Sequence, residues 1–212
     1  MATRSSDVIP KMPKAAVIAI LTSLLALASW FIFKKVVLYA SYDPATYDNL
    51  WPRRFGLIPH IAGGGIAALV GIVQLWLGLN GRTGALHRSL GRVYVFAIAV
   101  ASIGGFYLAL TIDPKLFAYS AGLFFLACAW VVTTSMALLA IHYRSFEQHR
   151  EWMIRSYIVT FAFVTFRLVG NLLVDWKIAS PGESDNFMAF ACWSVPLLLA
   201  EPLIQLRRIR RR

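Results

Sequence analysis

Long apolar runs alternate with short polar and basic segments along the whole chain. Six of these runs are long enough to cross a bilayer as helices, which need about 20 mainly apolar residues each. They cover residues 15–38, 59–79, 93–112, 119–141, 152–175 and 187–206. The first run is longer than the apolar core of a cleaved signal peptide, which is the alternative interpretation of an N-terminal run. The pattern predicts an all-α integral membrane bundle of six transmembrane helices, forming a single membrane domain over residues 1–212.

Basic residues are distributed unevenly between the two sides of this predicted bundle. With a cytoplasmic N-terminus, the cytoplasmic segments hold fourteen Lys and Arg residues and the opposite side holds six. Such an excess is the positive-inside pattern, so we expect both termini in the cytoplasm. The net charge of +11 has the same origin and does not indicate nucleic-acid binding. The expected location is a bacterial inner (cytoplasmic) membrane, crossed several times, with membrane lipids as partners.

Composition excludes a soluble domain, and the sequence lacks the motifs of several classes of enzyme. The chain is 58% hydrophobic and 15% charged, whereas soluble domains average about 25% charged residues. Cys128 and Cys192 both lie in apolar runs, where cysteine behaves as a small hydrophobic residue. The sequence contains no Gly-rich phosphate loop and no GxSxG, HExxH or CxxC motif.

The fifth run carries a polar face. Its members are separated by seven, four, seven and four residues, a spacing that brings them to one side of a helix. They are His149, Ser156, Thr160, Arg167 and Asn171. A charged group in hydrocarbon usually faces the bundle interior or a water-filled cavity. We therefore expect Arg167 to face inward, roughly 22 Å above the cytoplasmic end of its helix.

At that depth Arg167 approaches the level of His60, which begins the second run. A histidine and an arginine that converge near the outer leaflet are suited to bind a quinone carbonyl or an anionic head group. The alternatives are that Arg167 pairs with Asp175 or Asp43, or extends its charged end outward to the membrane surface.

His87 and His149 begin the third and fifth spans, at one depth near the cytoplasmic surface. Two neutral imidazoles on different helices are what bis-histidine ligation of a haem iron requires. Arginines beside them suit the haem propionates, because the guanidinium fork binds carboxylates; Arg88 and Arg155 are among these. Ordinary interfacial residues that serve topology are the alternative interpretation. His142 is either structural or replaces His87 or His149 as a ligand.

Three strings carry a resemblance to a known family. They are PHIAGGGIAALVGIVQLWLGL (59–79), LHRSLGRVYV (86–95) and HREWMIRSYIVTFAFVTFRL (149–168). They resemble a widespread bacterial family of multi-span membrane proteins catalogued as a domain of unknown function, over about residues 50–175. The family often has Trp where this chain has Ser89. The resemblance implies no activity, but it marks five family-motif positions: His60, His87, His149, Arg155 and Arg167.

By architecture alone, the chain is also similar to six-helix b-type cytochromes, whose haems lie between central helices. The pairing of His87 with His149 resembles one of their haem sites. A second haem is not expected, because His60 lies at the outer side and His142 at the inner side.

We therefore expect a membrane redox protein with one b-type haem, which exchanges electrons with a quinone or a partner complex. The residues leave open whether it is an oxidoreductase or an electron-transfer subunit, and they indicate no catalytic residue. The alternative is a non-enzymatic accessory or sensor subunit of a larger membrane complex, in which the His/Arg motifs serve packing and topology. The predicted metal ligands are His87 and His149, and the predicted cofactor-binding residues are His87, His149, Arg88, Arg155, His60 and Arg167.

Overall fold

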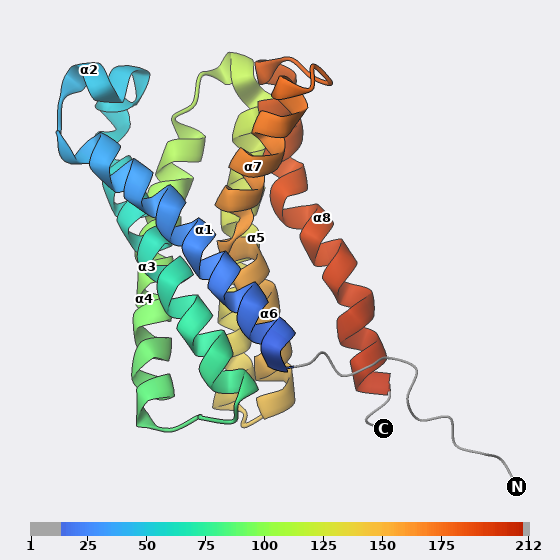
Figure 1. Ribbon diagram of the computed structural model, residues 1–212. Coiled ribbons are helices and arrows are strands. Elements are labelled where there is room, and N and C mark those ends of the chain that lie inside the picture. The colour runs from blue at the N-terminus through green and yellow to red at the C-terminus, as the bar shows by residue number, and fades with distance from the viewer. Residues whose placement is uncertain (1–13, 210–212) are drawn as a thin grey trace, which may run out of the picture.

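Helices account for almost all of residues 14–209, the part of the chain that the computed structural model describes (Figure 1). In hydrocarbon a helix satisfies every backbone N–H and C=O within its own segment, so apolar runs of this length become helices. In order they are α1 (Lys14–Ala40), α2 (Pro44–Tyr47), the 3-10 helix η1 (Asp48–Arg53), α3 (Arg54–Leu79), α4 (Ala85–Leu110), the 3-10 helix η2 (Pro114–Leu116), α5 (Phe117–His142), α6 (Phe146–Thr160), α7 (Ala162–Asp175) and α8 (Pro181–Ile209). These residues form no β-strand, and the all-α prediction is confirmed.

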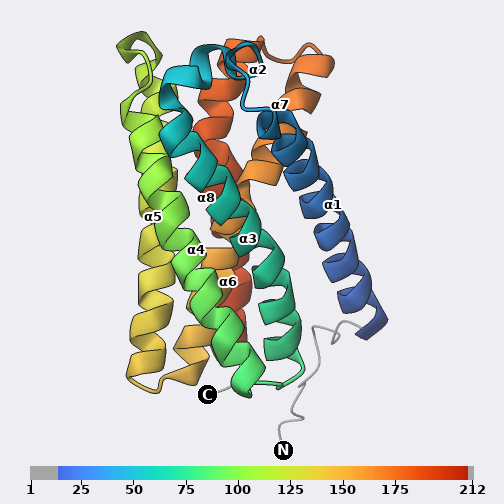
Figure 2. The same cartoon turned by 90° about the vertical axis from the view of Figure 1, so that its left-hand side faces the viewer.

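Successive long helices run up and down along one axis (Figures 1 and 2). The start of α1 and the end of α8 lie at the same end of the molecule, here called the lower end. The short loops that follow α3 and α5 also lie at the lower end, and α2 lies at the upper end.

Several of these helices meet the requirements of a membrane span. Within the described residues, four segments are long and apolar enough: Leu50–Leu79, Ala85–Leu110, Pro114–His142 and Pro181–Ile209. The bent pair α6–α7 makes a fifth if it counts as one span. Phe96, Ile103 and Leu110 on α4 are 71%, 73% and 70% exposed, as expected of side chains that contact lipid. The chain is therefore a multi-span membrane protein.

The first predicted span, 15–38, falls on α1, whose described apolar stretch is Leu25–Lys34. Residues 1–13 and 210–212, which contribute to the charge asymmetry, lie outside the described residues.

Four helices form the core of the bundle. α3 packs against α4 and α6, and α5 packs against the same two helices, so α4 and α6 face each other diagonally across the interior. Small residues allow the closest approach: a Cβ on Gly63 of α3 would lie 2.6 Å from the Ala97 carbonyl oxygen of α4. Ala67, Ala97 and Ala101 are buried in the same contact, as their four-residue spacing indicates.

The fifth predicted span is not one continuous helix, which corrects the expectation of an unbroken polar face. α6 and α7 meet at Phe161 with a bend of 42°. The Thr160 hydroxyl donates to the Ser156 carbonyl at 2.8 Å, an interaction that bends helices. Just beyond it, the Val164 N–H donates to the Phe161 carbonyl, three residues back. Arg167 and Asn171, which lie past the bend, are exposed rather than directed into the bundle.

Candidate functional site

Two histidines face the interior at the lower end of the four-helix core. His87 lies in the first turn of α4 and His149 in the first turn of α6. These are the two diagonal helices, and both begin at the lower end. The helices that carry them begin before the apolar runs do, so both residues are helical rather than part of the preceding loops.

Neighbouring helices hold both residues in place. The Nδ1 atom of His149 lies 2.9 Å from the Ala137 carbonyl oxygen on α5. A carbonyl only accepts, so Nδ1 carries the proton, and the neutral ring keeps a lone pair on Nε2. The Gln74 side chain of α3 donates to the His87 carbonyl oxygen at 2.6 Å. The His87 Nδ1 atom is buried without a hydrogen-bond partner.

A network of buried polar side chains lies above the two histidines. Tyr94, seven residues after His87, is roughly 10 Å farther up the same helix. Its hydroxyl oxygen lies 3.0 Å from Ser156 Oγ and 2.9 Å from Thr160 Oγ1 on α6. On α5, the indole of Trp130 donates to Thr160 Oγ1 at 2.8 Å, and Thr134 Oγ1 lies 2.8 Å from Ser156 Oγ. These contacts join α4, α5 and α6 across the core.

Helical spacing in the sequence predicted only part of this network. The sequence placed Ser156 and Thr160 on the face of His149, but it did not identify Tyr94, Trp130 or Thr134. For Tyr94 a signal was available, because it lies seven residues after His87 and therefore on the same helix face.

Of the arginines proposed for propionates, one is already paired. Arg155 binds Glu201 of α8 through two nitrogens, with N–O distances of 2.8–3.0 Å. It points away from the interior because it precedes the buried Ser156 by one residue, about 100° around the helix. Arg88 is exposed at the lower end of α4. The sequence contained one indication of this ion pair, Glu201, because an acidic residue within an apolar run usually has a partner.

The structure does not bring His60 and Arg167 into one site. His60 points into the core, with its Nδ1 2.8 Å from the Ala101 carbonyl oxygen and its ring edge-on to Trp130 at a centroid distance of 6.4 Å. Arg167 is exposed on α7, and its guanidinium lies 5.4 Å from the Phe166 ring centroid. His60 lies on α3 and Arg167 lies beyond the bend at Phe161, and their side chains have different surroundings.

The remaining histidine, His142, lies exposed at the end of α5, with its ring against Tyr143. Within residues 14–209 no group of three or more His, Cys, Asp or Glu side chains is arranged to hold a metal ion. The candidate site therefore consists of the two facing histidines, His87 and His149.

Comparison with known proteins gives one match. The model of a family described as "Predicted membrane protein (DUF2306)" matches residues 57–204, more than two thirds of the chain. No curated protein and no solved structure matches it.

Proposed function

The chain belongs to the DUF2306 family of predicted membrane proteins, and from this premise we propose that it is a membrane electron-transfer protein with one b-type haem. His87 and His149 are the residues that would hold the haem iron through their imidazole nitrogens. The observation that carries the proposal is their position in the first turns of two diagonal helices at the same end of the core.

The donor set fits this group. Hydrogen bonding of Nδ1 to Ala137 leaves His149 Nε2 available as a ligand, which is the usual arrangement of a metal-bound histidine. The unpartnered ring nitrogen of His87 is a buried polar atom that a bound group would satisfy. Bound haem supplies a one-electron redox centre.

The protein's own residues supply position and environment. Gln74 holds the first turn of α4 against α3 through the His87 carbonyl. The network around Tyr94 closes the interior above the site. Arg88 and Arg92, both exposed at the lower end, are the proposed partners of the propionates, because Arg155 already has its carboxylate.

We further propose that α1 is a sixth span and that the lower end is cytoplasmic, following the positive-inside pattern. The electron partner is then a membrane quinone or a protein of a larger complex, in a bacterial inner membrane. A quinone would not bind between His60 and Arg167, since these face different surroundings.

The visible spectrum of protein purified from cells with ample haem tests the proposal. The wild-type chain should show a Soret band, and His87→Ala and His149→Ala should each abolish it. His142→Ala is the matched control and should keep the band, because His142 is exposed outside the core.

A colourless wild-type protein that is folded and remains colourless after addition of haem would overturn the proposal and favour the accessory or sensor function. Loss of the band in His142→Ala alone would assign a ligand to His142 instead.

A further inference from the structure

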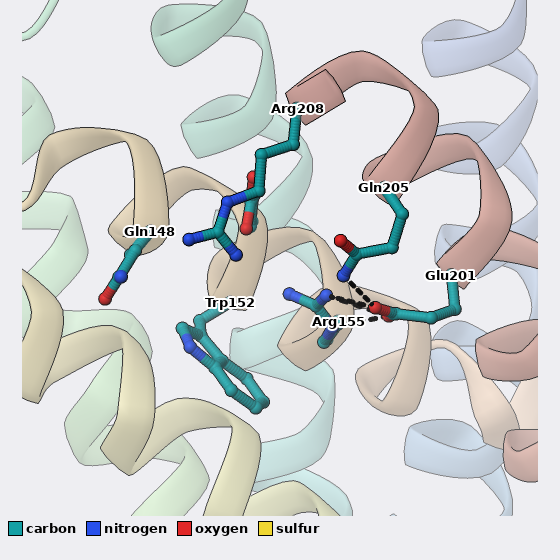
Figure 3. Close-up of a pocket in the computed structure, with 7 residues that line it drawn as sticks. Gln148, Trp152, Arg155, Glu201, Gln205 and Arg208 are labelled. Carbon is teal, nitrogen blue, oxygen red and sulfur yellow. Dashed lines mark hydrogen bonds and ion pairs between the residues drawn. The ribbon is translucent and has the colours of Figure 1, made fainter. Parts of the chain in front are cut away.

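A pocket lies outside the four-helix core, at the lower end between α6 and α8. It has a volume of about 520 Å³ (Figure 3). Its lining residues come from the first turns of α6 and the last turns of α8: Gln148, Glu151, Trp152, Arg155, Glu201, Gln205 and Arg208. In Figure 1, α8 leans away from α6 toward this end, which opens the space.

One wall of this pocket is held together by an ion pair and hydrogen bonds. The Arg155 side chain is 12% exposed and binds the Glu201 carboxylate through two nitrogens. Gln205 donates to the same carboxylate at 2.6 Å. The Arg155 guanidinium also lies 4.7 Å from the Trp152 ring centroid. These groups shape the pocket, and both Arg155 and Gln205 bind the Glu201 carboxylate.

Charged groups on the other wall remain for a ligand. Arg208 extends from α8 toward Gln148 on α6, across from the Arg155–Glu201 pair (Figure 3). Glu151 lies one turn after Gln148 and also lines the pocket. The free wall therefore offers a carboxylate and a guanidinium, one charge of each sign, within one pocket.

The surroundings point to a lipid. On α8, Leu198 precedes Glu201 by three residues and therefore lies one turn above the pocket on the same side of the helix; its apolar side chain is 71% exposed. It offers a contact for acyl chains directly above the polar pocket at the end of the span. A ligand with a polar head and apolar tails fits both parts.

The charges of the residues that line the pocket favour one kind of lipid head group. The lining residues include two arginines and two glutamates, so their formal charges cancel. A head group with a net negative charge would be attracted by Arg208 but repelled by Glu151. A choline head group carries no N–H to donate to the carboxylate, whereas a primary ammonium donates up to three hydrogen bonds.

We propose that this pocket binds the head group of an aminophospholipid, with its ammonium on Glu151 and its phosphate on Arg208. The lipid would fill the space between α6 and α8 beside the Arg155–Glu201 pair. The inference is independent of haem binding.

Native mass spectrometry of the full chain in detergent tests this site. The probes are phosphatidylethanolamine, phosphatidylcholine and phosphatidylglycerol with identical acyl chains. We expect phosphatidylethanolamine to be retained about tenfold more tightly than the other two, the effect of one additional charged contact. Glu151→Gln should remove most of this preference, and Arg208→Gln should weaken retention of all three lipids.

Two matched controls carry the same charge changes on the same helices outside the pocket. Glu147→Gln and Arg207→Gln should bind lipids as the wild type does. Thermal unfolding of each variant checks its fold, and if Glu151→Gln does not fold, the comparison of Arg208→Gln with Arg207→Gln decides. Equal retention of the three lipids by the wild type, or an unchanged preference in folded Glu151→Gln, would overturn the proposal. Equally strong binding of soluble glycerophosphoethanolamine would assign the site to a soluble zwitterion rather than a lipid.

Discussion

Tyr94 is the residue at which two helices of the core are joined by side-chain hydrogen bonds. Its ring is fully buried, and its hydroxyl contacts both Ser156 and Thr160. A buried hydroxyl that loses its partner has no water to replace it, so the loss destabilises the fold. In membrane proteins such bonds contribute less than the apolar surroundings suggest, because other partners are available in the unfolded state.

Tyr94→Phe should lower the free energy of unfolding by about 1–2 kcal/mol. The ring remains, so the change isolates the hydroxyl. Tyr107→Phe on the same helix is the control and should have little effect, since Tyr107 is 42% exposed. Thermal or denaturant unfolding in detergent measures both. Equal stability of Tyr94→Phe and wild type would contradict a contribution from the network.

Single residues also show which side-chain partners the sequence alone could not predict. His87 and His149 lie at the same end of the bundle, as their positions in the chain predict, although the sequence alone could not exclude His142 as a partner. Arg155 was predicted to bind a haem propionate because it lies near His149, and Arg167 was treated as a site residue because it carries charge within an apolar run. The structure gives Arg155 a carboxylate partner on a helix almost fifty residues later in the chain, a contact that local spacing cannot reveal.

At the scale of the helices, small residues decide how closely α3 and α4 approach. Gly63 and Gly64, which are adjacent on α3, have different surroundings. A Cβ on Gly63 would lie 2.6 Å from the Ala97 carbonyl oxygen, whereas a Cβ on Gly64 would meet its nearest neighbour, Trp130, at 3.8 Å. A contact of 2.6 Å would require α3 and α4 to separate, whereas a contact of 3.8 Å is an ordinary van der Waals contact.

Gly63→Ala should therefore destabilise the protein by about 1–3 kcal/mol, the usual effect of overpacking. Gly64→Ala should be neutral or stabilising by up to about 1 kcal/mol, because alanine favours the helix over glycine. Melting temperatures of the two variants provide the comparison. If both alanines had the same effect, the close contact of α3 with α4 would be wrong.

The break between α6 and α7 is the feature of the helices that the sequence pattern did not predict. The run from 152 to 175 contains no proline, and its polar residues keep helical spacing throughout. At the bend, the hydroxyl of Thr160 bonds back to the Ser156 carbonyl while also accepting from Trp130. The Trp130 side chain comes from α5, so the sequence of residues 152–175 alone does not predict this pair of hydrogen bonds.

At the scale of the whole molecule, the chain begins and ends its described helices at one end of the bundle. This arrangement agrees with an even number of spans, and the charge asymmetry indicates which side that end occupies. In the proposed orientation, the loop of residues 80–84 lies in the cytoplasm and the loop of residues 176–180 on the opposite side.

Labelling by a membrane-impermeant maleimide tests this topology. In a background with Cys128→Ala and Cys192→Ala, Thr83→Cys should react only in inside-out vesicles, and Ile178→Cys only in right-side-out vesicles. Both positions are exposed, so each is a control for the reactivity of the other. Labelling of both cysteines from the same side would exclude the proposed arrangement.

The sequence by itself determined which segments are helical and that the chain lies in a membrane. A bilayer requires internally hydrogen-bonded segments of a set length, and hydropathy records that length directly. Only the tertiary structure decided which polar side chains meet. The direction of each side chain depends on how its helix is rotated, bent and packed against helices distant in the chain. For that reason Tyr94 and Trp130 share Thr160, Arg155 binds Glu201, and Arg167 lies outside the core.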